Sequence, residues 1–137
     1  MPSPNRPYIA SRVFNDAKLL ESLNKIIHPK VREDFKNWQQ CQTAPYCLYE
    51  AAILFEHGGE AACDHTILVT APKEIRIQRL LNRDHSDHRE IEARMAAQWS
   101  DDKKMALADF VIENLLLNET EKKVSELHDK LLQMATA

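Results

Sequence analysis

Apolar residues near the start of the chain recur with the spacing of amphipathic helices. Asn5 can cap a short helix with Pro7 in its first turn, where the missing N–H of proline costs nothing. Asn15 or Asp16 can cap a longer helix, whose apolar positions are Leu19, Leu20, Leu23, Ile26 and Ile27. Pro29 is expected to interrupt or kink this helix, because proline disfavours the α conformation of the residue before it. A next helix would then begin near Pro29, with the apolar stripe Val31, Phe35 and Trp38.

Beyond Pro45 the pattern changes to apolar runs of strand length. Residues 46–55 are almost continuously apolar, which predicts a strand buried on both faces of a parallel sheet. Residues 65–70 predict a second, more β-branched strand, and residues 109–112 predict a short third one.

Helices are predicted between and after these strands. One starts at Pro72 and has the apolar residues Ile75, Ile77, Leu80 and Leu81. Asp87 can cap the next helix, with Glu90 completing a capping box. Asn118 with Glu121 can open the last helix, whose stripe is Val124, Leu127, Leu131 and Met134. The pattern therefore predicts a helical subdomain followed by α/β units.

Composition and charge narrow the class of protein. The 137 residues are 44% hydrophobic and 28% charged, which fits one soluble globular domain. The formal net charge of -3 provides no basic field that would attract nucleic acid or anionic lipid. No apolar run reaches membrane-spanning length and residues 1–6 contain no signal-peptide core, so we expect a cytoplasmic protein without a membrane partner.

The cysteines and histidines do not predict a metal centre. Three cysteines without a CxxC pair, at Cys41, Cys47 and Cys63, argue against a disulfide framework. Cys63 with His65, and His85 with His88, have the spacing of half-sites, but a closed zinc site needs about four suitably spaced ligands. We therefore expect no metal ligands among them, with Cys47 a small strand hydrophobe and the two loop histidines in polar surroundings.

Arginines form the most suggestive candidate site. Arg76, Arg79 and Arg83 share one face of a predicted helix, and Arg94 with Gln98 form an i, i+4 pair on the following helix. A polar loop, residues 84–88, joins the two helices, as in a lid that closes over a polyphosphate. The alternative is a solvated helical face with local acidic partners, which composition alone favours; those partners are Glu74, Asp84, Glu90 and Glu92.

Two further features could contact a ligand. His28, before Pro29, could contact an anion or a hydroxyl at a helix N-terminus, or could simply lie at a helix junction. Glu50 and Glu56 fall near the end of a predicted buried strand, where open α/β sheets place ligand-binding groups. No Ser/His/Asp or Cys/His arrangement and no paired carboxylates with an acid/base division can be argued from spacing.

Several motifs in order along the chain resemble the dephospho-CoA kinase family. Residues 23–29, LNKIIHP, are similar to the family's L-N-x-I-x-H-P signature, and residues 9–16 to the segment that leads into its CoA-binding helices. Residues 52–56, AILFE, resemble P-L-L-F-E with Ala52 in place of proline. The remaining matches are residues 79–84 to R-x-x-x-R-D, 94–98 to R-I-x-x-Q, and 108–114 to A-D-x-V-I-x-N.

The resemblance implies a fold and an activity. The fold would be α/β, a partial P-loop kinase-like parallel sheet in one truncated domain. Its parts would be CoA-binding helices (5–42), two core strands (45–71), a helical lid (72–100), and a last strand with a C-terminal helix (108–137). The activity would be the last step of coenzyme A biosynthesis, in which ATP with Mg²⁺ phosphorylates the 3′-hydroxyl of dephospho-CoA.

The same resemblance implies roles for individual residues. Arg83 and Arg94 would act in catalysis by contacting ATP phosphates from the lid. Arg79, Gln98 and Asn114 would bind the nucleotide, with Asn114 near the adenine. His28 and Glu56 would help form the dephospho-CoA site.

The sequence also departs from the family pattern. It contains no Walker A loop, since its only glycines are the adjacent Gly58 and Gly59. It also contains no D-x-D-x-x-A-R motif. Leu115 and Leu116 stand where the family has x-Gly. We therefore expect a truncated, mispredicted or split gene product that is inactive alone. Its exposed sheet edges would pair either with a second copy of the chain or with the missing N-terminal segment. Two alternatives are a non-catalytic CoA- or nucleotide-binding module and a truncated kinase of another P-loop family.

Overall fold

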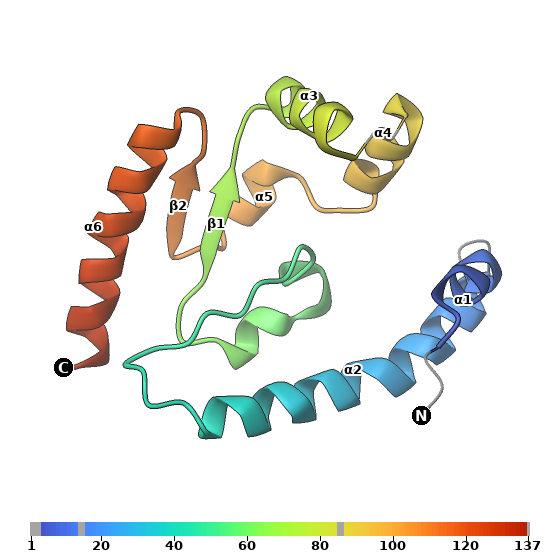
Figure 1. The fold of residues 1–137 in the computed structure, drawn as a ribbon, viewed down its shortest axis with the longest axis horizontal. Helices are drawn as coiled ribbons and strands as arrows, with labels where there is room; N and C mark the ends of the chain where they lie inside the picture. The colour runs from blue at the N-terminus through green and yellow to red at the C-terminus, as the bar shows by residue number, and fades with distance from the viewer. Residues whose placement is uncertain (1–3, 14–15, 85–86, 137) are drawn as a thin grey trace. The chain divides into compact units, whose positions relative to one another are not determined.

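The computed structural model describes residues 4–13, 16–84 and 87–136. The chain divides into two compact units, Met1–Cys47 and Leu48–Ala137, which are described separately below (Figure 1). None of the helices in the described ranges combines the length and the apolar character needed to cross a bilayer.

The first unit consists of two helices, α1 (Arg6–Val13) and α2 (Ala17–Gln40), that contact each other. The N–H of Tyr8 donates to Asn5 Oδ1 at 3.1 Å, which confirms the cap predicted at Asn5. The Asp16 carboxylate accepts from the N–H groups of Lys18 and Leu19, both at 3.0 Å, and so caps α2. The alternative cap, Asn15, lies outside the described residues.

The predicted interruption at Pro29 is wrong. Helix α2 runs without a break through Pro29 for 24 residues (Figure 1). Proline inside a helix loses one backbone hydrogen bond and costs roughly 3 kcal/mol, which a helix of this length can offset through its other bonds and its packing. No helix therefore begins at Pro29, and the helix-dipole argument for an anion at His28 fails with it.

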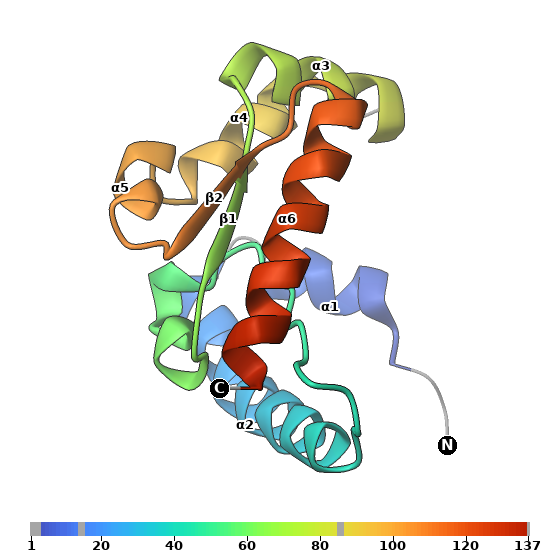
Figure 2. The same ribbon diagram turned by 90° about the vertical axis from the view of Figure 1, so that its left-hand side faces the viewer.

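The second unit is built on a two-stranded parallel sheet. Strand β1 (Ile67–Thr70) pairs with β2 (Phe110–Glu113) in the register Ile67 to Phe110 and Thr70 to Glu113. Both strands were predicted from their apolar, β-branched residues, and the parallel pairing is confirmed. Helix α6 (Leu117–Ala135) contacts β2, and α5 (Asp101–Met105) contacts β1 from the other side of the sheet (Figure 2).

The strand predicted over residues 46–55 is wrong. Residues 46–50 are irregular, and the chain then turns into two short 3₁₀ helices, η1 (Phe55–His57) and η2 (Gly59–Ala62). A strand needs a neighbour for its backbone hydrogen bonds, and β1 and β2, the sheet of the described residues, pair only with each other. The apolar run instead contributes Phe55 to the core, where it is 7% exposed.

The two glycines serve the turn between these 3₁₀ helices. Gly58 has φ 65°, a left-handed conformation that a side chain disfavours. A Cβ on Gly59 would lie 2.8 Å from Leu54 Cδ1 and 3.2 Å from the Leu54 carbonyl oxygen, so any other residue there would require the Leu54 side chain to move. Both glycines are therefore explained by local geometry.

Helices α3 (Lys73–Asp84) and α4 (His88–Ala96) follow β1 and contact each other. The Asp87 side chain accepts from the Glu90 N–H at 2.9 Å, which confirms Asp87 as the cap of α4. The cap predicted at Asn118 is wrong, because the extended residue at the start of α6 is Leu116 and Asn118 already lies in the first turn. Helix α5, capped by the Ser100 hydroxyl, was not predicted.

The core of the second unit is small. Its buried apolar residues include Phe55, Ala71, Ile91 and Ile112, of which Ile91 is 1% exposed. Two polar residues, Thr66 and Lys104, are equally buried at 7% exposure each. Buried polar groups need hydrogen-bond partners, so these two residues indicate where side-chain networks replace apolar packing.

Candidate functional site

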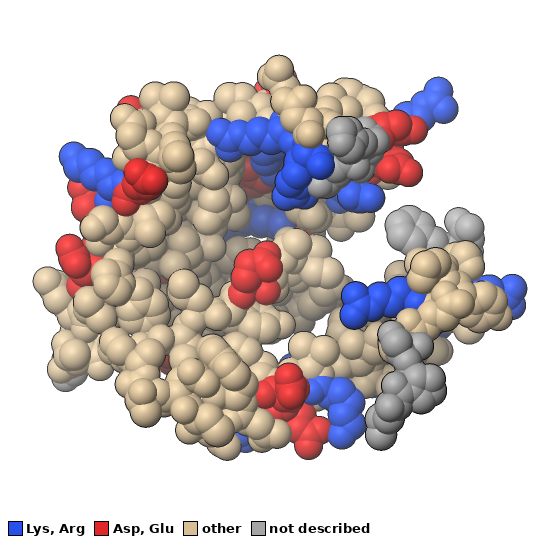
Figure 3. Space-filling view, viewed as in Figure 1, with Lys and Arg blue, Asp and Glu red and all other residues tan. Residues whose placement is uncertain are grey.

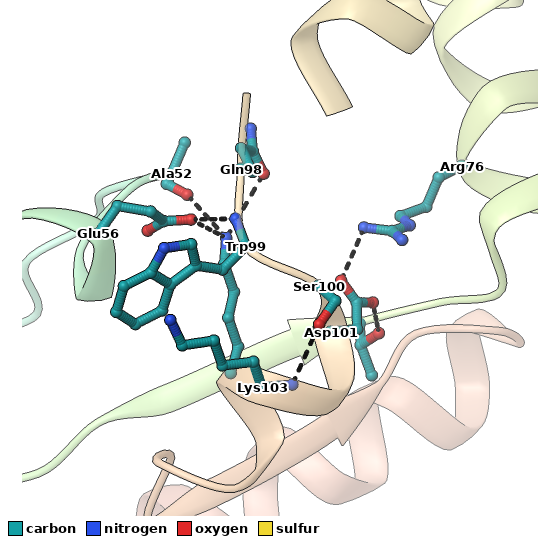
Figure 4. Close-up of polar contacts among 10 residues, drawn as sticks. Ala52, Glu56, Arg76, Gln98, Trp99, Ser100, Asp101 and Lys103 are labelled. Atoms are coloured by element: carbon teal, nitrogen blue, oxygen red, sulfur yellow. Dashed lines mark hydrogen bonds and ion pairs between the residues drawn. The ribbon is translucent and has the colours of Figure 1, made fainter. Parts of the chain in front are cut away.

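Helix α3 presents its arginines to two different parts of the second unit. Arg76 Nη1 lies 3.2 Å from Asp101 Oδ1 at the start of α5, and Asp101 Oδ2 accepts from the Thr70 hydroxyl at 2.5 Å (Figure 4). Thr70 ends β1, so this network joins α3 and α5 at the carboxyl end of the strand. Arg76 is thus not part of a merely solvated face.

Arg79 and Asn114, both predicted to bind nucleotide, lie together. Arg79 Nη1 donates to the Asn114 carbonyl at 2.8 Å and Nη2 donates to the Leu115 carbonyl at 3.0 Å. The Asn114 N–H in turn donates to the Thr70 carbonyl at 2.7 Å, and Asn114 Oδ1 accepts from the Thr120 hydroxyl at 3.2 Å. The guanidinium of Arg79 therefore fixes the loop between β2 and α6.

Arg83 and Arg94 have exposed side chains on α3 and α4, the two helices that were predicted to form a lid. Arg83 follows Arg79 by about one turn on α3, and Arg94 lies in the last turn of α4. Basic side chains gather over α3 and α4 in the space-filling view (Figure 3). Residues His85 and Ser86 of the intervening loop lie outside the described residues.

Glu56 and Lys104 form a buried ion pair between η1 and α5. Lys104 Nζ lies 2.9 Å from Glu56 Oε1, and each side chain is only 9% exposed. The same Glu56 oxygen accepts from the Trp99 N–H at 2.8 Å (Figure 4). Burial alone raises the pKa of the Glu56 carboxyl, but the hydrogen bonds from Lys104 and Trp99 outweigh it and lower the pKa below the ordinary 4.5.

Gln98, a predicted nucleotide-binding residue, joins this cluster. Its side-chain oxygen lies 3.5 Å from Lys104 Nζ, and the Ala52 carbonyl lies 3.4 Å from the same nitrogen. The segment from Gln98 to Lys104 is therefore tied to residues 52–56 at both of its ends. Sequence reasoning missed Lys104 and Asp101, because a run of four charged residues, 101–104, reads as solvated surface.

His28 belongs to the first unit. It lies inside α2, directly before Pro29, and is half-buried. Glu50, which lies within the run that was predicted as a strand, is exposed in an irregular segment. The structure thus brings Arg79, Asn114, Gln98 and Glu56 into networks within the second unit, and leaves Arg83 and Arg94 at its surface.

The described residues contain no group of three His, Cys, Asp or Glu side chains close enough together to hold a metal ion. Cys63 Sγ contacts the Gly59 carbonyl at 3.7 Å, and burial followed by the charges of Asp64 and Glu60 raises its pKa. His65 instead lies 4.0 Å from the Asp109 carboxylate.

Comparison with known proteins gives consistent matches. A family model described as dephospho-CoA kinase matches residues 3–119. A dephospho-CoA kinase of Chlorobium chlorochromatii is 39% identical over 137 residues, covering 96% of this chain and 64% of that protein. The crystal structure of TT1252 from Thermus thermophilus superposes with a TM-score of 0.85 at 32% identity, covering 93% of this chain and 67% of that one. Dephospho-CoA kinase from Campylobacter jejuni shares the fold with a TM-score of 0.53 at 22% identity. The chain therefore spans 64% of the length of its Chlorobium relative.

Proposed function

Since the chain belongs to the dephospho-CoA kinase family, we propose that it carries the lid and the acceptor-binding helices of an enzyme that phosphorylates dephospho-CoA with ATP. Its fold is the predicted partial P-loop kinase-like α/β fold. The other P-loop kinase families considered above are thereby set aside.

The proposed reaction is phosphoryl transfer to the 3′-hydroxyl of dephospho-CoA. The hydroxyl oxygen attacks the γ-phosphorus of ATP, the bond to the β-bridging oxygen breaks, ADP leaves and the hydroxyl proton is released, giving coenzyme A. Catalysis of such transfers depends mainly on positioning and on neutralising the phosphoryl oxygens. Mg²⁺, when bound with ATP, supplies part of this charge, and the remaining positive charge must come from side chains.

The exposed arginines of the lid suit that role. We assign Arg83 and Arg94 to the ATP phosphates, because each guanidinium projects from a lid helix that packs against the other. Arg79 is assigned to the nucleotide site indirectly: its bonds of 2.8 and 3.0 Å to the carbonyls of Asn114 and Leu115 order the loop proposed to lie near the adenine. This bidentate contact, which joins two predicted nucleotide-binding residues, is the observation that carries the proposal. Gln98 is assigned to the same site.

His28 and Glu56 are assigned to dephospho-CoA. Glu56 is held by Lys104 and the Trp99 N–H through one oxygen, so its role is to shape the wall of the acceptor site. His28 lies half-buried on α2, among the helices that correspond to the family's acceptor-binding segment. We also place the protein in the cytosol, which agrees with its three free cysteines.

We further propose that this chain binds its ligands but does not turn them over alone. Gly58 and Gly59 are both used in a 3₁₀ turn, so no glycine is left for a phosphate-binding loop. Fusing a Walker A segment, or adding it in trans, is expected to produce ATP consumption that depends on dephospho-CoA. Persistent inactivity with saturable ligand binding would favour the alternative, a non-catalytic CoA- or nucleotide-binding module.

The arginine assignment is tested by calorimetric titration of the chain with ATP. Arg83→Ala and Arg94→Ala are each expected to weaken binding by roughly 10-fold, the cost of losing one charge-assisted contact to phosphate. Lys122→Ala is the matched control, because it removes one exposed cation from α6, whose ion pair with Glu126 spans 4.0 Å. Equal ATP affinity in the arginine variants and the control would refute the assignment.

A further inference from the structure

Lys104 is a buried cation whose donors are all matched by acceptors. The residue is 7% exposed, and its ammonium group has three N–H bonds. Its acceptors are Glu56 Oε1 at 2.9 Å, the Ala52 carbonyl at 3.4 Å and Gln98 Oε1 at 3.5 Å. A lysine is rarely buried unless it is paired in this way, so the site is built around its charge.

These acceptors come from segments that are far apart in the sequence. Ala52 belongs to the run that was predicted as a strand and Glu56 follows directly after it, whereas Gln98 lies just after α4 and Lys104 lies in α5. The Trp99 N–H strengthens the junction, because it donates to the same Glu56 oxygen at 2.8 Å. One ammonium and one carboxylate thus hold three segments at a single point (Figure 4).

Stability alone is a weak reason for such a pair. The cost of removing both charges from water offsets much of their attraction, and well-packed apolar residues often stabilise a fold as much. The three acceptors of Lys104, in contrast, define a direction and a distance for each segment. A buried ion pair with this many partners therefore suits a role in holding these segments at fixed positions relative to one another.

We infer that Lys104 is a positioning residue that fixes the carboxyl end of the lid, Gln98 and Trp99, against Ala52–Glu56. This inference rests on the function proposed above, because the lid end that Lys104 holds is one turn from Arg94 and contains Gln98. By fixing the residues that follow the C-terminus of α4, Lys104 positions the side chains of Arg94 and Gln98 for nucleotide binding. Its three N–H donors are all taken up by Glu56, Ala52 and Gln98, so the role assigned to it is indirect.

Three variants of the full chain separate positioning from charge balance. Lys104→Met keeps the length of the side chain but leaves Glu56 buried without its cation. The double variant Glu56→Gln with Lys104→Met removes both charges, so the stability lost in the single variant should return. Lys103→Met is the matched control: it removes the neighbouring, exposed cation, which lies 3.1 Å from the centre of the Trp99 ring and outside the buried cluster.

Amide hydrogen exchange and ATP titration are measured on each variant. The single Lys104 variant should melt roughly 10 °C lower than the parent chain, and the double variant should recover most of that loss. In both, amides of residues 88–99 should exchange about 10-fold faster and ATP should bind about 10-fold more weakly, while the amides of α6 remain unchanged. The Lys103 variant should match the parent chain.

Two results would overturn the inference. One is a double variant that recovers parental exchange in residues 88–99 and parental ATP affinity together with its melting temperature, since Lys104 would then only neutralise Glu56. The other is a Lys104→Met variant with unchanged exchange in that segment. If the parent chain itself binds no ATP, the proposed function fails, and the exchange data still decide whether Lys104 holds the lid end.

Discussion

Adjacent charged residues of this chain have opposite environments. Lys103 lies over the Trp99 ring with its side chain toward solvent, whereas Lys104 is 7% exposed and paired with Glu56. Successive residues of a helix point about 100° apart, so one turn of α5 can bury one lysine and expose the next. A charged run thus does not reveal which of its members is buried. That choice depends on where Ala52 and Glu56 lie in space.

The lowered pKa of Glu56 predicts a stability that depends on pH. Its pKa is about 4.5 when unfolded and lower in the folded chain, so the deprotonated pair stabilises the fold above that value. The contribution is lost as pH falls below about 4.5 and through the folded pKa. Glu56→Gln should therefore show a smaller fall in the free energy of unfolding between pH 5 and pH 3 than the parent chain, by urea denaturation.

Asp109 is the control for that measurement. Hydrogen bonds from the Thr66 hydroxyl and N–H, at 2.8 and 2.7 Å, lower its pKa as well. Asp109→Asn should keep the part of the acid dependence that comes from Glu56. Parallel acid curves for Glu56→Gln and the parent chain would show that Glu56 does not carry the effect.

Helices α3, α4 and α5 depend on specific caps and side-chain contacts. Helix α4 is capped by Asp87, α5 by Ser100, and α3 is tied by Arg79 to the loop that follows β2. Caps of this kind can be read from sequence, because they require a particular residue type at a particular position. The Arg79 clamp could not be predicted, since its acceptors are main-chain carbonyls 35 and 36 residues away.

Asp87→Ala should destabilise the second unit by about 1 kcal/mol, because the Glu90 N–H loses its acceptor at the start of α4. The same helix carries Ile91, the most buried residue of the core, so fraying should be visible in global unfolding by urea. Asp87→Ser retains a capping oxygen and should cost only a few tenths of that amount. Equal losses for alanine and serine would show that the cap does not matter.

At the scale of the whole molecule, the described residues of the two units differ in how much apolar side-chain surface they bury. The buried apolar residues Phe55, Ala71, Ile91 and Ile112 all belong to the second unit, Leu48–Ala137. The first unit, Met1–Cys47, consists of α1 and α2. Binding of a ligand to the folded chain should therefore change its stability measurably, because a fold with a small core has a small free energy of unfolding.

Dephospho-CoA is expected to raise the melting temperature of the chain. At a concentration of about 100 times its dissociation constant, a ligand that binds only the folded state adds about 2.7 kcal/mol. His28→Ala should reduce this shift. Lys30→Ala, on the same helix with a side chain that is 79% exposed, should retain it. A broad transition that dephospho-CoA leaves unmoved in the parent chain would contradict acceptor binding by this chain.

The sequence by itself determined the local elements and the family of this protein. Caps at Asn5, Asp16 and Asp87 and the two β-branched strands follow from residues close together in the chain, so neighbouring side chains suffice to specify them. The ordered motifs that resemble dephospho-CoA kinases led to the family that the comparisons support.

Features that depend on residues far apart in the sequence were decided only by the tertiary structure. The run 46–55 is apolar enough for a strand, but a strand forms only where another backbone offers its hydrogen bonds. Pro29 is tolerated because the rest of α2 outweighs one lost bond. Lys104 is buried because Glu56, Ala52 and Gln98 meet around it, a coincidence in space that no periodicity along the chain records.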